Sequence, residues 1–233
     1  SFNNFTHMKT KILLAALLIT QTIFSQNENS RKIGDFNILK VYDLVNIELV
    51  RAEENHAEVT GEYSNSIVIK NKNGELKVRM GIERRFRGAN TKVKIFYNNI
   101  EKIYVHEGAF VYSKDTISQE NIYVKADEGA RVVFNINTTS FSTNTSSGAT
   151  MDVQGKTQYH RAKVNTGAEL KASGLETEET EVFLTTGAVA DVFAKNTLKV
   201  NVRAGGTVNV HSKTRKIVEN KLAGGTINYL YEN

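Results

Sequence analysis

The stretch EGAFV at residues 107–111 returns as EGARV at 128–132 and as SGATM at 147–151, and related stretches follow to the end of the chain. Each stretch places a very small residue directly after a glycine. The glycines recur every 18 to 21 residues, at Gly108, Gly129, Gly148, Gly167, Gly187, Gly205 and Gly224. A period near 19 residues is typical of a solenoid. We interpret the glycines as structural corners, because glycine permits a tight turn with positive φ.

Apolar and polar residues alternate on both sides of each glycine. The third residue after it is apolar, as in Val111 and Val132, and the positions between the apolar ones are mostly polar, although Phe110 and Tyr112 depart from that rule. Because side chains alternate between faces along a strand, each repeat carries two strands, and stacked repeats bury ladders of like residues. The sequence predicts an all-β fold, a right-handed parallel β-helix (β-solenoid) of about ten coils with 19–20 residues per coil.

Two segments fit the repeat less well. Apolar alternation at 67–69 and 76–78 flanks a turn-prone sequence, which predicts either a hairpin or a corner between two coils. Lys221 stands three residues before Gly224, where the other repeats have an apolar residue. A bulge that brings Leu222 inward, or a frayed last coil, would account for that lysine.

The start of the chain has the pattern of a secretory signal peptide. Met8 opens it, Lys9 and Lys11 form a positive region, an apolar run covers residues 12–19, and a cleavage site follows near Ser25. No later stretch approaches the roughly 20 apolar residues of a spanning helix, so we expect no transmembrane segment in the mature chain. The expected organisation is upstream residues plus signal peptide at 1–25, a polar leader at 26–32 and a single solenoid domain at 33–233.

Composition narrows the function. The chain has no cysteine, which excludes disulfides, thiolate metal sites and thiol nucleophiles, and it has no tryptophan. Absence of proline suits uninterrupted central strands. The net charge is +5, and it falls to +3 once residues 1–25 with their two lysines are removed. An excess this small does not indicate a nucleic acid partner, and no motif indicates a cofactor.

Several segments resemble the head-GIN domain family (DUF2807), described as the head of an auto-transporter adhesin. The resemblance is carried by the phrase IGDFNIL at 33–39, the segment NGEL at 73–76 and the later Gly-Ala and Gly-Gly coils, and it covers residues 31–231. Members are common in Bacteroidetes, carry signal peptides and form right-handed β-helices. The resemblance implies an exported protein of the periplasm or cell surface, and it supplies no catalytic residues.

One outward column is the main candidate binding site. It lies two residues before the glycines, and its candidate ligand-binding residues are His106, Asp127, Asn165, Thr185 and Arg203. Stacked coils would repeat these hydrogen-bonding groups about every 4.8 Å, which suits a sugar chain laid along the coils. The alternative is an ordinary polar outer face.

Other polar clusters allow weaker hypotheses. The basic run Arg84, Arg85 and Arg87 is either a solvated loop or a site for an acidic polysaccharide. The five histidines lack metal-ligand spacing, so we predict no metal site. His160 falls in an inward column, which indicates a partly buried histidine.

A second ladder contains Asp152, Lys171 and Asp191, four residues after successive glycines. It is either an ion-pair stack or an acidic catalytic pair. Two coils would separate the acids by about 9.6 Å, at the far edge of the geometry of inverting glycosidases. We therefore favour the ion-pair stack.

Three functions remain open. We favour an exported, non-catalytic cell-envelope protein that binds a glycan or an envelope protein along the solenoid surface, because no catalytic constellation accompanies the repeats. The alternatives are a polysaccharide-acting enzyme, lyase or hydrolase, on a β-helix scaffold and a purely structural scaffolding module.

Overall fold

The computed structural model describes residues 30–231, so the expected signal peptide lies outside the described residues. The described chain from Arg31 onward forms one compact unit. The strands of its first part are β1 (Ser30–Lys32), β2 (Ile38–Val41), β3 (Asn46–Arg51), β4 (His56–Gly61), β5 (Ile67–Lys72), β6 (Glu75–Met80), β7 (Thr91–Tyr97) and β8 (Lys102–Val105). Three short 3-10 helices lie among them, η1 (Ser64–Ser66), η2 (Ile82–Arg84) and η3 (Gly88–Asn90).

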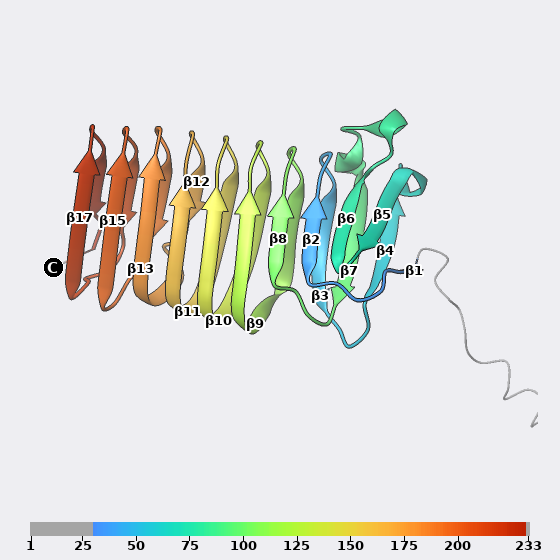
Figure 1. The fold of residues 1–233 in the computed structure, drawn as a ribbon, viewed down its shortest axis with the longest axis horizontal. Coiled ribbons are helices and arrows are strands. Elements are labelled where there is room, and N and C mark those ends of the chain that lie inside the picture. The colour runs from blue at the N-terminus through green and yellow to red at the C-terminus, as the bar shows by residue number, and fades with distance from the viewer. Residues whose placement is uncertain (1–29, 232–233) are drawn as a thin grey trace, which may run out of the picture. The chain divides into compact units, whose positions relative to one another are not determined.

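The second part of the chain is a regular stack. Its strands are β9 (Phe110–Ala126), β10 (Arg131–Thr145), β11 (Thr150–Val164), β12 (Glu169–Lys171), β13 (Leu175–Thr185), β14 (Val189–Val192), β15 (Thr197–Arg203), β16 (Thr207–Val210), β17 (Lys216–Leu222) and β18 (Thr226–Tyr229). Successive coils pair in parallel, and β10 and β11 keep one register from Arg131↔Thr150 to Thr145↔Val164. The fold is therefore an all-β parallel solenoid, and Figure 1 shows its coils side by side.

Each coil reverses direction at a two-residue turn. In the turn at Glu107 and Gly108 both residues have positive φ, at 53° and 67°, and the Ala109 amide donates to the His106 carbonyl at 3.0 Å. This is the geometry of a type I′ turn, which favours glycine at its second central position. All seven repeat glycines have φ between 65° and 87°.

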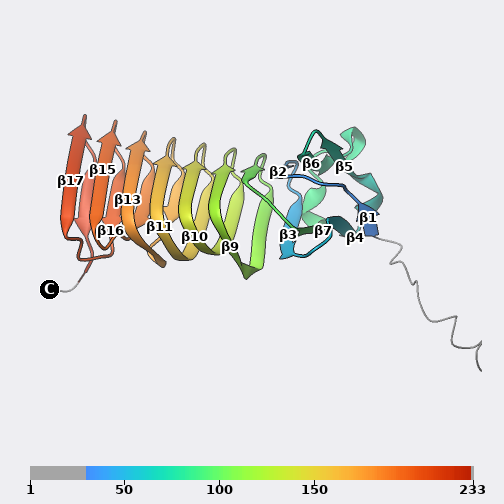
Figure 2. The ribbon, with the colours of Figure 1, turned by 60° about the horizontal axis from the view of Figure 1, so that its bottom comes forward.

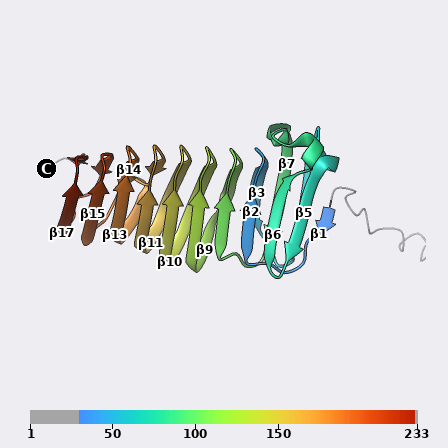
Figure 3. The same ribbon diagram turned by 45° about the horizontal axis from the view of Figure 1, so that its top comes forward.

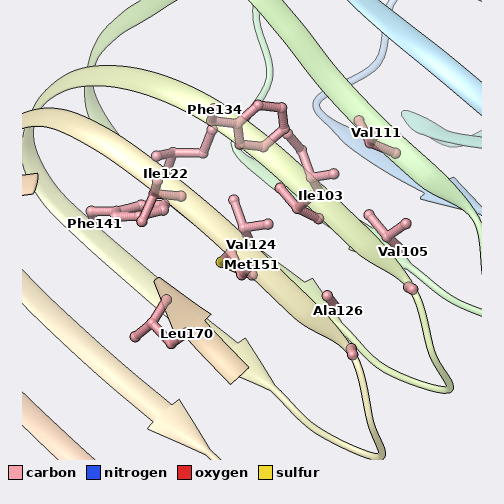
Figure 4. Packing of buried hydrophobic residues seen from close by; sticks show 14 of the residues in the cluster. Ile103, Val105, Val111, Ile122, Val124, Ala126, Phe134, Phe141, Met151 and Leu170 are labelled. Carbon is pink, nitrogen blue, oxygen red and sulfur yellow. The ribbon is translucent and has the colours of Figure 1, made fainter. Parts of the chain in front are cut away.

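Apolar ladders fill the interior between two sheets. Val105 pairs with Ala126, and Ile103 with Val124, so that like side chains stack from coil to coil. The side chains of Phe134 and Phe141 are fully buried among them, and Figure 4 shows these residues converging on one core. The alternation of apolar and polar residues along each strand thus places one face inside and the other in solvent.

The coils do not follow one another in chain order at the N-terminal end. Strand β2 lies between β6 and β8 and pairs in parallel with both, as Figure 2 also shows. The segment 67–78 forms a hairpin, because β5 runs antiparallel to β6. β4 runs antiparallel to β7 and closes the end of the other sheet, and β5 closes the first (Figure 3). The solenoid has about seven turns rather than ten, because part of this region forms an antiparallel cap.

The last coil keeps its register, so the expected bulge near Lys221 is absent. Val202 pairs with Lys221 and Arg203 with Leu222 without a shift. Lys221 therefore takes the inward position, and Leu222 is 66% exposed. Charged residues at inward positions mark this coil as the end of the stack, since a further coil would bury them without partners.

Candidate functional site

The side chains that precede the type I′ turns form a continuous outward row, here called the turn row. Its members are Tyr42, His106, Asp127, Ser146, Asn165, Thr185 and Arg203. His106 Nδ1 hydrogen-bonds Asp127 Oδ1, and Thr185 Oγ1 donates to Asn165 Oδ1 at 3.0 Å. The structure therefore brings the predicted ladder residues of neighbouring coils into contact, and Arg203 extends the row as an exposed cation.

Aromatic rings gather at the N-terminal end of the turn row. The Tyr42 ring stacks on His106 with centroids 4.8 Å apart, and Tyr104 lies 6.4 Å from His106 on the neighbouring outward column. Tyr123 follows Tyr104 at 5.7 Å. These four rings, Tyr42, Tyr104, His106 and Tyr123, are called the aromatic patch below. They form a partly exposed platform of the kind on which sugar rings or side chains stack.

Lysines frame this patch. Lys77 Nζ lies 4.6 Å from the Tyr42 ring centroid, and Lys40 Nζ lies 5.5 Å from that of Tyr104. Burial raises the pKa of the Tyr42 hydroxyl above its ordinary value. The tyrosines therefore stay neutral at physiological pH and present hydrogen-bonding hydroxyls next to cationic groups.

One group beside the turn row could supply metal ligands. Ligand atoms of His106, Asp127 and Glu128 lie within 4.8 Å of one another. However, Asp127 Oδ1 is bound to His106, and Asp127 Oδ2 pairs with Lys125 Nζ at 2.7 Å. A cation would have to compete with the Lys125 ammonium, so we do not propose a metal site here.

Two carboxyl groups meet at the turns next to this row. Asp43 is 2% exposed, and its Oδ2 accepts a hydrogen bond from the Met80 amide at 3.2 Å. Burial, and then the nearby Asp43 carboxyl, raise the pKa of Glu107. Arg85 Nε lies 3.7 Å from Asp43 Oδ1, so this arginine of the basic run offsets a buried charge.

Glu107→Gln is expected to stabilise the protein slightly at pH 7. Because the folded pKa of Glu107 is raised, the free energy of unfolding falls as pH rises from the ordinary pKa through the raised one. Glutamine removes this loss, with a gain below about 1 kcal/mol because solvent screens the largely exposed group. Thermal unfolding at pH 7 and pH 4 would measure it. The matched control is Glu128→Gln on the next turn, and an equal shift in both variants would contradict the assignment.

The other arginines of the basic run lie apart from this contact. The Arg84 guanidinium lies 5.3 Å from the Tyr63 ring centroid. Arg85 contacts Asp43, and Arg87 flanks η3 at its N-cap. The run therefore contributes to packing around the cap, and a polyanion would have only part of its charge available.

The acidic ladder on the opposite sheet is in register. Asp152 pairs with Lys171, which pairs with Asp191. Lys171 Nζ contacts Glu169 Oε2 at 3.4 Å, and Asp191 Oδ1 accepts hydrogen bonds from His211 Nε2 at 2.7 Å and Asn209 Nδ2 at 3.2 Å. The two acids are thus separated by a lysine, and Asp191 is held by two donors. This arrangement stabilises the stack without forming a paired acid and base.

Sequence reasoning missed Tyr42 as a member of the turn row. Its turn contains Leu44 instead of glycine, with φ at 61°, so the glycine alignment passed over this coil. Leu39 and Val41, two apolar residues at the spacing of the repeat, are the signal that could have identified it.

The comparisons with known proteins agree with the fold. Three solved structures resemble the chain, although identities of 13–15% support the fold alone. A "putative adhesin" from Bacteroides fragilis gives a TM-score of 0.76 at 13% identity, covering 86% of this chain and 95% of its own. A "putative lipid binding protein" from Parabacteroides distasonis gives 0.65 at 15%, covering 87% and 98%. A "putative adhesin" from Parabacteroides merdae gives 0.65 at 15%, covering 86% and 94%.

A family model provides the closer assignment. None of the curated proteins compared matches the sequence. The model described as "Putative auto-transporter adhesin, head GIN domain" matches residues 35–213, which include both the antiparallel cap and most of the coils. The chain belongs to the head-GIN domain family.

Proposed function

We propose that this protein is an exported, non-catalytic cell-envelope protein that binds a glycan or an envelope protein along its turn row. The observation that carries the proposal is the aromatic patch, where rings and hydrogen-bonding groups from neighbouring coils lie on one rigid face. A ligand laid along the coils would meet the same type of contact at each step. Such repetition suits an extended polymer better than a small molecule.

Two observations support a binding role over catalysis. The family and two of the similar structures are described as adhesins. In addition, Lys171 separates Asp152 from Asp191 in the ladder that sequence analysis considered as a catalytic pair.

Export rests on the signal-peptide pattern around Met8 and Ser25. Among the described residues, no helix is long and apolar enough to cross a membrane. We place the mature protein in the periplasm or on the cell surface, where envelope glycans and proteins are accessible.

Binding to an array of envelope polysaccharides and to envelope extracts tests the proposal. Tyr104→Ala and His106→Ala are expected to weaken binding at least about tenfold, because each removes part of the platform. Tyr159→Ala, which removes a 51% exposed tyrosine from another part of the surface, is the matched control. Absence of any ligand, or equal losses in all three variants, would contradict a turn-row site.

A further inference from the structure

A second candidate site lies on the other sheet, where the cap meets the regular coils. The outer faces of β4, β7, β3 and the start of β9 enclose a groove of about 410 Å³. β4 is antiparallel to β7, while β3 pairs in parallel with both β7 and β9, and Figure 2 shows β4, β7 and β3 together. The volume lies in the usual range of small-molecule sites.

Strand register arranges the groove as two rows of side chains. One row crosses the sheet as Glu58, Lys94, Glu48 and Tyr112, and the other as Thr60, Lys92, Asn46 and Phe110. Acidic and basic groups therefore alternate, and their charges cancel within the groove. Phe110 and Tyr112 are the two aromatic residues that departed from the polar outward columns of the repeat.

The aromatic wall is held in place by its neighbours. The Phe110 and Tyr112 rings stack with centroids 5.1 Å apart, and the Arg131 guanidinium lies 5.2 Å from the Phe110 centroid. Tyr112 Oη donates to Glu48 Oε2 at 3.3 Å, and Lys114 Nζ pairs with Glu48 Oε1 at 2.8 Å. The wall is thus preorganised, which lowers the entropy cost of binding.

We infer that this groove binds a neutral saccharide, with a pyranose ring stacked against Tyr112 and Phe110 and its hydroxyls directed to the flanking polar groups. This inference rests on the proposed glycan-binding role and adds a site on a different sheet from the turn row. A sugar ring offers an apolar CH face together with donors and acceptors around its rim.

The charge pattern distinguishes this ligand from the alternatives. An acyl chain would remove water from Glu58, Lys92 and Lys94 without replacing their hydrogen bonds, which is costly. An acidic sugar would place a carboxylate beside Glu48 and Glu58, so only part of its charge would be favoured. A neutral saccharide satisfies donors and acceptors alike.

Titration of the intact protein with maltotriose and cellotriose, followed by ligand-observed NMR, tests the inference. Trigalacturonate and laurate serve as the anionic and lipidic probes. We expect a neutral trisaccharide to bind, and Tyr112→Ala to weaken that binding at least about tenfold. Glu58→Gln, a milder change at the opposite side of the groove, is expected to weaken it several-fold and guards against a folding defect in the alanine variant.

The turn-row variant Tyr104→Ala separates this inference from the proposed function, since it should leave trisaccharide binding unchanged. Loss of binding in Tyr104→Ala but not in Tyr112→Ala would overturn the groove and support the turn row. Tyr112-dependent binding of trigalacturonate or laurate alone would overturn the neutral-saccharide class. A wild-type protein that binds envelope ligands but neither neutral trisaccharide would also overturn the inference and leave the proposed function standing.

Discussion

Acidification from pH 7 to pH 4 is expected to cost the protein about 3 kcal/mol of folding stability through His160 alone. This side chain is 3% exposed, and its ring stacks on Phe141 with centroids 5.4 Å apart. Burial lowers the pKa of His160 from 6.5 to about 4. The unfolded chain therefore takes up a proton below pH 6.5 that the folded protein resists until about pH 4, and stability falls across that window.

His160→Phe removes the titrating group and keeps a ring in the column. Phe141 occupies the equivalent position one coil earlier, so the replacement fits the stacking. Its cost is the loss of the contact between His160 Nε2 and Thr143 Oγ1 at 3.2 Å. Denaturant unfolding at pH 7 and pH 4 would give the difference between variant and wild type at each pH.

That difference is expected to change by about 3 kcal/mol in favour of the variant on going to pH 4. His56→Phe, which replaces a partly exposed histidine stacked on Phe96 at 4.0 Å, is the matched control. Parallel stability curves for His160→Phe and wild type would show that His160 gains its proton without penalty in the folded state.

His160 also illustrates what the sequence can predict. Its inward position followed from the alternation of residues around Gly167, and the structure confirms the parallel solenoid that this alternation predicts. Repeats are predictable because each coil applies the same local rules, with apolar residues at every second position and glycine at the turn. The expectation of partial burial was too cautious, since the ring is enclosed by the neighbouring coils.

The order of the coils could not be predicted in this way. Asn73 and Gly74 have φ of 54° and 80°, close to the values at Glu107 and Gly108. The same turn geometry joins the paired strands of the β5–β6 hairpin and strands β8 and β9 of a coil, whose flanking segments pair with other coils. Which partner a strand takes depends on distant segments, and the local pattern is alike in both cases.

The same limit applies to the candidate sites. The turn row was predictable because it repeats with the glycines, whereas Tyr42 joins it only because β2 lies beside β8. The groove likewise requires β4 to pair with β7, a contact that follows from the cap. Side chains brought together by a break in the repeat are therefore the ones that a repeat alignment misses.

Gly155→Ala is expected to be the most damaging of the single-methyl changes considered, with a loss of about 4 kcal/mol. Gly155 has φ of 110°, and an added Cβ would lie 2.1 Å from the Ile136 carbonyl oxygen and 2.6 Å from Asn135 Oδ1. The carbonyl belongs to the adjacent strand and is held in register with Gly155 and Leu175. Relief of the clash would separate backbones of stacked coils, so neighbouring coils would share the strain.

Gly148→Ala in the same coil separates this steric effect from backbone conformation. Gly148 also has positive φ, at 72°, but an added Cβ there meets nothing within 4 Å. Its expected cost is about 1 kcal/mol, from the left-handed conformation alone. Denaturant unfolding of both variants should therefore give a difference of about 3 kcal/mol between them. Equal losses would mean that the close approach of the coils at Gly155 does not limit the residue type, and that the requirement for glycine is conformational at both positions.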